Sequence, residues 1–266
     1  MGVRLATNLV GSAYAVDHVD VSDVGRQRVK EAIGIDCVDQ ATALQSADVV
    51  VMAVPDKLIG TIAKTFVADL NPGTAVIMLD AAAPPAGELP EREDITYFVT
   101  HPCHPPLFND ETSEEAKNDH FGGIHAKQHI VCALMQGPEA QYALCEDIAR
   151  TIYKPVMRSH RVTVEQWAIL EPALSETVGA TLALAMRKAV DQAVGMGVPK
   201  QAAMDFMLGH LNIELAVAFE VFDGRFSDGA LEAIADAEPI VFKDGWLERV
   251  FEPEAIRDSV IKSCQP

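Results

Sequence analysis

The sequence predicts an α/β domain built on a parallel sheet, followed by an all-α domain. Between residues 15 and about 130, short β-rich runs alternate with helical stretches, which is typical of βα units in a parallel sheet. After about residue 161, long segments rich in Ala, Leu and Met carry apolar residues at helical spacing. We therefore expect two domains in this 266-residue chain, over residues 1–160 and 161–266.

Each element of the first half follows from its local pattern. Residues 47–54 form an almost unbroken apolar run, the kind that fills a sheet covered on both faces. A helix is expected over 61–70, closed by the turn Asn71-Pro72-Gly73. The full set of expected strands is 16–21, 47–54, 75–79, 95–100 and 129–134, and the further expected helices are 3–9 and 24–33.

Two long helices are expected in the second half. Residues 162–194 predict one helix with a kink at Pro172, and residues 199–222 predict a second that starts with proline near its first turn. Both are too apolar for a helix with one solvated face. We therefore expect them to pack against each other or against a partner subunit, and we predict a homodimer built from this half.

Charge and composition exclude several classes of partner. The 39 acidic and 21 basic residues give a net charge of −18, which would repel a phosphate backbone, so we expect no nucleic-acid partner. The apolar stretch 178–196 is interrupted by Arg187, Lys188 and Asp191, so we expect no membrane span. Five scattered cysteines without C-x-x-C spacing predict a reduced, cytoplasmic protein.

An acidic residue at the end of an early strand points to a dinucleotide site. Asp20 stands where a Rossmann-like unit places the acid that binds the adenosine ribose, about 20 residues beyond the glycine-rich turn. Counting back reaches Gly2, which would be the last glycine of G-x-G-x-x-G. We expect the chain to begin inside this fingerprint, with the first strand missing. The alternative for Asp20 is an acid that caps the next turn.

The segment after the expected strand 47–54 supports the same site. Ala53, Val54, Pro55 and Lys57 follow an apolar run, where the backbone would pass close to a nicotinamide ribose. An acid at Asp20, rather than a basic pair, favours NAD over NADP, because the extra phosphate of NADP requires arginine.

A proline-rich turn after the strand 95–100 carries the reactive side chains of the chain. It reads His101-Pro102-Cys103-His104-Pro105-Pro106, and its prolines would hold the imidazoles on a stiff loop. Histidine can act as acid and base near neutral pH, so we predict His101 and His104 as catalytic. The alternative is that each imidazole only caps a strand by bonding to backbone. We expect Cys103 to be a small packing residue.

Three motifs carry a family resemblance. They are AVPDKLIG at 53–60, THPCHPPLFNDE at 100–111 and SHRVTVEQWAILEPALSET at 159–177. Together they resemble the 6-phosphogluconate dehydrogenase-like oxidoreductases, and the histidine-rich segment resembles the D-apionate oxidoisomerases within that group. The resemblance implies a Rossmann-like domain followed by an all-helical one, NAD as cofactor, and conversion of D-apionate, a branched sugar acid, to 3-oxo-isoapionate.

Such a reaction has two steps with different needs. Oxidation of the secondary alcohol needs a base for the hydroxyl proton, and the rearrangement that follows needs charge stabilisation at two oxygens. Protonated imidazoles or a divalent metal would serve, and the metal requirement is left open. The alternatives are a plain 3-hydroxy acid dehydrogenase of the same superfamily and a non-catalytic NAD-binding dimer.

Other polar residues complete the expected site. Glu171 lies in an apolar helix, where a carboxylate is costly unless paired, and we predict that it supports the two histidines; the alternative is an exposed helix acid. Ser175 lies four residues further along the same face. His160 and Arg161 form a basic spot that could receive the substrate carboxylate, or a solvated linker.

Two further hypotheses concern metal and loop motion. His101, Cys103 and His104 could bind a metal, although spacing alone identifies no distant fourth ligand; Glu171 is the best candidate. The spacing of three more histidines around a glycine pair at 122–123 suggests a flap that closes on the substrate, with an ordinary surface loop as the alternative. These histidines are His120, His125 and His129.

Overall fold

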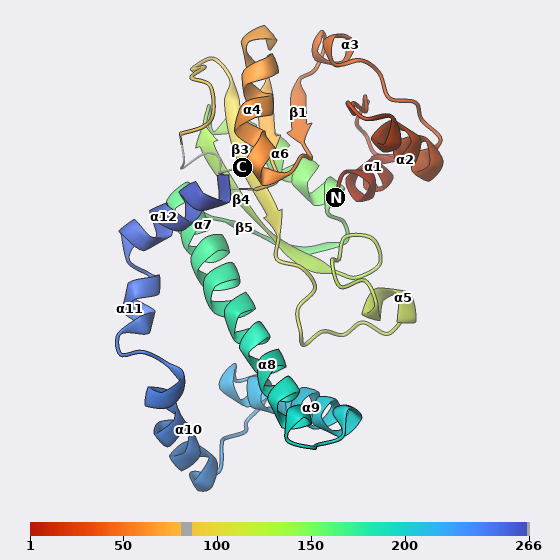
Figure 1. Cartoon of the computed structure of the whole chain (residues 1–266). Coiled ribbons are helices and arrows are strands. Elements are labelled where there is room, and N and C mark those ends of the chain that lie inside the picture. The colour runs from red at the N-terminus through yellow and green to blue at the C-terminus, as the bar shows by residue number, and fades with distance from the viewer. Residues whose placement is uncertain (81–86, 265–266) are drawn as a thin grey trace. The chain divides into compact units, whose positions relative to one another are not determined.

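The computed structural model describes residues 1–80 and 87–264 and divides into two compact units (Figure 1). The first unit holds Met1–Ala168 together with Arg257–Pro266, and the second holds Ile169–Ile256.

A five-stranded sheet organises the first unit. Its strands lie in chain order: β1 (Val49–Met52), β2 (Ala75–Met78), β3 (Thr96–Pro102), β4 (Gln128–Gln136) and β5 (Val156–Arg161). The first three strands are parallel, β4 runs antiparallel to β3, and β5 runs parallel to β4. The predicted fold class, a mostly parallel α/β sheet domain followed by a helical region, is confirmed, with one antiparallel pair that the sequence pattern did not indicate.

Helices cover both faces of this sheet (Figure 1). On one face, α4 (Asp56–Phe66) packs on Val76, Met78 and Val99, and the indole of Trp167 joins the same cluster. On the other face, α6 (Ala140–Ile152) and α1 (Gly2–Leu9) pack on side chains that include Phe98. Each large side chain buried in this way contributes about 1.5–3 kcal/mol, so the two cores fix the sheet that carries the site.

The remaining helices of the first unit are short. They are α2 (Asp23–Ile33), α3 (Gln40–Leu44), the 3₁₀ turn η1 (Val67–Asp69), α5 (Glu114–Lys117) and α7 (Val164–Ala168). The Ser22 hydroxyl caps α2 by accepting the Gly25 amide at 2.9 Å, and Gly34 ends it in a left-handed conformation. The expected helix over 61–70 begins earlier, at Asp56, because Pro55 provides a preformed N-terminus.

One predicted strand is absent, and one observed strand was not predicted. Residues 16–21 run outside any strand, and the Val38 amide donates to the His18 carbonyl at 2.9 Å. A β-rich run forms a strand only when a partner strand completes its hydrogen-bond ladder, and no strand in the described part of the chain pairs with this one. Conversely, the segment Val156–Arg161, which the sequence pattern left without a strand, pairs with β4 as β5.

The second unit is entirely helical in its regular structure. It contains η2 (Ile169–Ala180), α8 (Thr181–Gly195), α9 (Lys200–Ala218), α10 (Asp228–Val241) and α11 (Trp246–Val250), and α12 (Pro253–Cys264) returns the chain to the first unit. The expected helix over 162–194 is present as α7, η2 and α8, and the expected helix over 199–222 is α9, with Pro199 at its N-cap.

Pro172 causes the irregularity that the sequence predicted as a kink. The helix widens to π geometry over η2, because proline lacks an amide proton and its ring displaces the preceding turn. The Thr177 hydroxyl donates to the Pro172 carbonyl at 2.6 Å and takes up part of the hydrogen-bonding capacity that this distortion leaves.

One helix among the described residues, Val164–Gly195, is long and apolar enough to cross a membrane by length and composition alone. This helix differs from our expectation of no membrane span, and the core helix of a soluble protein can have the same length and composition.

Candidate functional site

The carboxyl end of β3 carries the first of the two predicted catalytic histidines. His101 and Pro102 still pair with β4, so the turn expected over 101–106 begins only at Cys103. The Cys103 amide donates to the His129 carbonyl at 2.9 Å and closes the base of the loop. Cys103 is exposed, so the expected packing role of its thiol was wrong.

The ring of His101 is half-buried and is held by the neighbouring strand. Its Nδ1 lies 2.8 Å from the carbonyl oxygen of Leu79, directly after β2. Because a carbonyl only accepts hydrogen bonds, Nδ1 carries the proton, and in the neutral ring Nε2 is the basic nitrogen. The ring also meets the indole of Trp167 edge-on, at 6.2 Å between centroids, and Trp167 is only 1% exposed. His101 is therefore held between the Leu79 carbonyl and the buried indole of Trp167.

His104 lies in a different kind of environment. Its φ of 60° is in the left-handed region, which residues other than glycine rarely adopt. The ring is anchored at Nδ1, 2.9 Å from the Phe121 carbonyl oxygen, so Nε2 is again the basic nitrogen. Such backbone strain persists only where surrounding contacts hold it, and it is concentrated at functional sites.

The structure brings these two imidazoles together. Their ring centroids are 6.0 Å apart, and the rings are nearly perpendicular at 85°. Each ring has its Nδ1 bound to a backbone carbonyl, so both present the same tautomer. Two neighbouring imidazoles of fixed tautomer can accept a proton at one Nε2 and deliver one from the other, which is the arrangement that acid–base chemistry requires. Their catalytic role stays a prediction.

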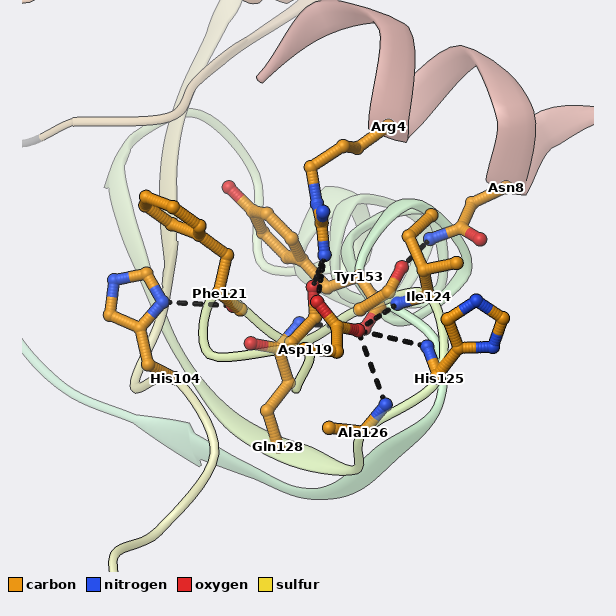
Figure 2. A network of polar contacts seen from close by, with 12 residues as sticks. Arg4, Asn8, His104, Asp119, Phe121, Ile124, His125, Ala126, Gln128 and Tyr153 are labelled. Carbon is orange, nitrogen blue, oxygen red and sulfur yellow. Dashed lines mark hydrogen bonds and ion pairs between the residues drawn. The ribbon is translucent and has the colours of Figure 1, made fainter. Parts of the chain in front are cut away.

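The carbonyl that holds His104 belongs to a loop fastened by Asp119 (Figure 2). Oδ2 of Asp119 accepts the backbone N–H groups of residues 124–126 at 3.2, 2.9 and 3.2 Å, and Oδ1 forms an ion pair with Arg4. Burial alone would raise the pKa of Asp119, but the amides and the Arg4 guanidinium outweigh it and lower the pKa to about 2. Asp119 is therefore a carboxylate throughout the physiological range.

Side chains of helix α1 hold the same loop by donating hydrogen bonds to carbonyl groups of the loop (Figure 2). Arg4 donates to the Gly122 carbonyl at 2.5 Å, and the buried Asn8 amide donates to the Gly123 carbonyl at 2.5 Å. The loop predicted as a flap is thus tied to α1 at its two glycines. His129, which the same prediction included, lies in β4 instead.

Sequence reasoning did not single out Asp119 or Arg4. A weak signal was available for Asp119, because an Asp in a loop, here three residues before a Gly-Gly pair, often accepts backbone N–H groups of its own loop. Nothing in the sequence marks Arg4, since its role depends on a loop more than a hundred residues away.

Two of the segments predicted to bind the dinucleotide, Gly2 and residues 53–57, meet where β1 ends. Gly2 opens α1, and a Cβ placed on it would lie 3.8 Å from the Cβ of Ala53. The structure shows no side-chain cap for α1 or α4 in the described residues, which leaves amides at both helix N-termini for an anionic group. Pro55 is the N-cap of α4 and the exposed Lys57 lies in its first turn. The donor set fits a dinucleotide phosphate.

Val54 lies between these two helix ends. It is half-buried and packs against the core cluster under α4, so its side chain supports the loop while its backbone follows β1.

Asp20 is held in place by the start of α2. Its Oδ1 accepts the Ser22 amide at 2.8 Å, and its carboxylate lies so close to Gly25 that a Cβ there would come within 2.1 Å of it. The turn-capping alternative is therefore present in the structure. It does not exclude ribose binding, because a carboxylate has acceptor capacity for several donors.

The basic spot at His160 and Arg161 is part of β5, so it is not a solvated linker. The guanidinium of Arg161 forms a bidentate ion pair with Glu139 and lies 4.1 Å from the ring centroid of Tyr142. Arg161 is thus engaged within the protein, and its role as a receptor of the substrate carboxylate stays an untested prediction.

His160 shares its sheet face with His101 and His129. His101 and His160 are both in register with Val131 on β4, and side chains of paired residues point to the same face. The rings of His129 and His160 lie 5.8 Å apart. Burial, Arg158 and His160 together lower the pKa of His129, so this ring is neutral near pH 7.

Glu171 and Ser175 lie in η2 of the second unit. Glu171 is half-buried and Ser175 is exposed. Both stand on the stretch that Pro172 distorts, and their predicted roles remain predictions.

The geometry gives little support for the predicted metal site at His101, Cys103 and His104. Within residues 1–80 and 87–264, no group of three His, Cys, Asp or Glu side chains is arranged to hold a metal ion. The side chains of His101, Cys103 and His104 therefore do not form a metal site by themselves.

Known proteins share both the sequence and the fold. A family model described as phosphogluconate dehydrogenase (decarboxylating) C-term matches residues 109–264. A D-apionate oxidoisomerase from Rhizobium rhizogenes is 58% identical, and one from Cupriavidus necator is 54% identical; each alignment covers 98% of this chain and 94% of the relative. A solved structure of a semialdehyde dehydrogenase NAD-binding protein from Cupriavidus necator, in complex with calcium and NAD, is 54% identical over 98% of this chain and 94% of its own, with a TM-score of 0.96.

The sheet, the helix ends beside β1 and the match over residues 109–264 define an oxidoreductase of the 6-phosphogluconate dehydrogenase-like class. That class contains several chemistries, and the near full-length matches narrow it. The chain belongs to the D-apionate oxidoisomerase family. The resemblance predicted from three motifs is confirmed.

Proposed function

We propose that this chain is an NAD-dependent oxidoisomerase that oxidises D-apionate and rearranges the product to 3-oxo-isoapionate. The observation that carries the proposal is the identity of 58% and 54% to two D-apionate oxidoisomerases over nearly their whole length. The segment from His101 to Pro106, which carries both imidazoles, lies inside the aligned region that the two sequences and the fold share.

The nucleotide site of the proposal is the end of β1. The amides of α1 beside Gly2 would hold the pyrophosphate, and Asp20 would accept the adenosine ribose hydroxyls. Ala53, Val54 and Pro55 would let the backbone pass close to the nicotinamide ribose, with Lys57 at the rim. Bound NAD supplies the acceptor for the hydride that leaves the secondary carbon of the substrate.

The imidazoles handle the protons of both steps. In the first step, Nε2 of one histidine accepts the proton of the secondary hydroxyl as the hydride leaves, which gives a ketone. In the second step, the same type of group accepts the proton of the neighbouring tertiary hydroxyl, and a carbon group migrates to the ketone carbon. The imidazole protonated in the first step donates that proton to the new alkoxide, and the second imidazole, which took the proton of the tertiary hydroxyl, releases it to solvent, so that one hydride passes to NAD and one proton is released overall.

Four other residues support this site in the proposal. Glu171 would orient one of the histidines, and His160 and Ser175 would bind the substrate. Arg161 is the weakest of the four, since Glu139 already pairs with it. A Glu171→Gln variant with unchanged kcat and KM for D-apionate would remove Glu171 from the site.

The test is turnover of D-apionate by the purified protein. We expect NADH absorbance to rise with D-apionate and NAD, and product NMR to show 3-oxo-isoapionate. An unrearranged ketone would identify a plain 3-hydroxy acid dehydrogenase, and NAD binding without turnover would identify a non-catalytic dimer. A parallel assay with a chelator, restored by added divalent metal, would establish whether a metal is required.

We also infer that the protein is a homodimer assembled through the helical unit. Large apolar side chains stay exposed along α8, α9 and α10, namely Leu184, Phe206, Leu208, Ile213, Leu231, Ile234 and Ile240. Such a surface is typical of a subunit interface. Light scattering should give the mass of two chains, and Phe206→Asp should lower it while the control Val24→Asp, on exposed α2, should not.

The remaining partners of the proposal follow from charge and chemistry. The substrate is a small sugar acid, and a net charge of −18 argues against nucleic acid. We place the enzyme in the cytoplasm and away from membranes, supported by the free state of Cys37, Cys103, Cys132 and Cys145.

A further inference from the structure

We propose that Asp119 is a positioning residue for His104 and that, through Arg4, it couples the cofactor end of α1 to this imidazole. The inference rests on the proposed role of His104 and names residues outside the predicted site. It stands on one connected set of contacts, seen in Figure 2.

The first step is the contact between the loop and the histidine. The Phe121 carbonyl fixes the Nδ1 proton of His104, and the Phe121 ring meets the imidazole edge-on at 5.9 Å. The next residue, Gly122, has φ of 71°, and a Cβ on it would lie 2.8 Å from the Cδ of Pro105. The loop thus lies directly on the ring of Pro105, the residue after His104, and a shift of the loop moves the carbonyl that sets the tautomer.

The second step is what fixes the loop. Asp119, with a side chain 6% exposed, gathers the three amides of residues 124–126 and closes the loop on itself. The same carboxylate binds Arg4. The guanidinium of Arg4 also donates a hydrogen bond to the Gly122 carbonyl at 2.5 Å. One guanidinium therefore joins the carboxylate that shapes the loop to the residue next to Phe121.

The third step is the place of Arg4. It lies in the first turn of α1, two residues after Gly2, at the helix end whose amides face the proposed pyrophosphate site. An anion bound at this end and the ordering of the loop therefore act on the same helical turn. Coupling between two sites is reciprocal, so cofactor binding should order His104, and the ordered His104 loop should strengthen cofactor binding.

The experiment compares two variants of this network with a matched ion pair elsewhere. Arg4→Gln removes the charge from a side chain that is one-third exposed, and Asp119→Asn removes the partner charge. The control is Arg150→Gln, which breaks a half-buried Arg–Glu pair on α6 at 3.2 Å. Circular dichroism identifies any variant that does not fold; should Asp119→Asn fail, Arg4→Gln carries the test.

We expect Arg4→Gln to lower kcat for D-apionate by about 10-fold to 100-fold, the usual effect of losing a group that orients a reacting one. The KM for the sugar acid should change little, and the Kd for NAD should rise. Arg150→Gln should alter none of these values. In a His104→Ala background, Arg4→Gln should lower kcat no further, because the group that it positions is gone.

A second readout does not depend on turnover, so failure of the substrate assignment and failure of this proposal are distinguishable. The ¹⁵N chemical shifts of His104 report which ring nitrogen is protonated. Wild type should show the Nδ1–H tautomer, sharpened by NAD, and Arg4→Gln should show a mixture of tautomers. An unchanged tautomer in Arg4→Gln, or an equal loss of kcat with and without His104, would overturn the proposal.

Discussion

His101 and His104 lie in one site but are held in place in opposite ways. His101 ends a buried strand, with its Nδ1 on the backbone of the adjacent strand and its ring against Trp167. His104 lies in a loop, in a left-handed conformation, with its Nδ1 on a carbonyl that side-chain contacts of Asp119 and α1 keep in position. The sheet fixes the first imidazole and a polar network fixes the second, so mutations of the residues around them should affect the two rings differently.

The largest effect should come from removing either imidazole. His101→Ala and His104→Ala should each lower kcat/KM for D-apionate by about 10²-fold to 10⁴-fold, the usual contribution of a general acid or base. The two losses should be similar, since both rings are assigned to proton transfer. Initial rates of NADH formation measure them, and a variant with the wild-type rate would show that its imidazole only caps the chain.

Removing the Trp167 indole, which packs against His101, should strongly lower the free energy of unfolding. Trp167 is 1% exposed, so Trp167→Ala should lower the free energy of unfolding by about 3–5 kcal/mol. Trp167→Phe keeps an aromatic ring and should cost less. Urea denaturation gives both values. A loss below about 1 kcal/mol for the alanine variant would contradict the view that a packed core positions His101.

The loop beside His104 should be sensitive to a single methyl group. Gly122→Ala places a Cβ at φ of 71°, within 2.7 Å of Gln128 Oε1. The left-handed conformation alone should lower the free energy of unfolding by about 1–2 kcal/mol, and the close approach to Gln128 should lower it by about 1–3 kcal/mol more.

Gly73→Ala is the matched control for that prediction. Gly73 has φ of 86°, and no described atom lies within 4 Å of an added Cβ, so only the conformational cost should appear. Thermal unfolding compares the two variants. Equal losses would mean that the loop does not press on its neighbours as the structure indicates.

The smallest effect should appear in acid. Asp119 has its pKa lowered to about 2 in the folded protein, from an ordinary value of 3.8, so its charge stabilises the fold above pH 4. That stabilisation, roughly 2 kcal/mol, should be lost as the pH falls from about 4 to about 2. Asp119→Asn cannot titrate and should show a flatter stability curve over this window in chemical denaturation. Curves of equal slope would place the stabilising charge elsewhere.

The same contrast explains which features the sequence predicts. The strands that became β1, β2 and β4 were predictable because each has an apolar run that is buried by a covered sheet. The run over 16–21 alternates valine with polar residues, as a strand can, but it lacks a partner strand in the described residues, and a sequence pattern does not report pairing. β5 was missed for the opposite reason, because its polar residues, such as Arg158, conceal a strand whose other edge is open.

The site was predictable where chemistry is concentrated in a few consecutive residues. His101 and His104 are three residues apart, so their proximity follows from the chain itself. Asp119 and Arg4 come from distant segments, and each would be an ordinary surface residue in isolation. Tertiary contact alone gives them a role, and one sequence contains no record of that contact.

The antiparallel pairing of β3 with β4 fixes the base of the loop that carries His104. Because β4 returns beside β3, the intervening residues 103–127 leave and rejoin the sheet at one place, and the Cys103 amide closes the stem on His129. The two ends of this segment are therefore fixed by the sheet, and the residues between them can differ without changing the order of the strands. Exchanging residues 103–127 between relatives could therefore change the substrate preference while leaving the cofactor-binding sheet unaltered.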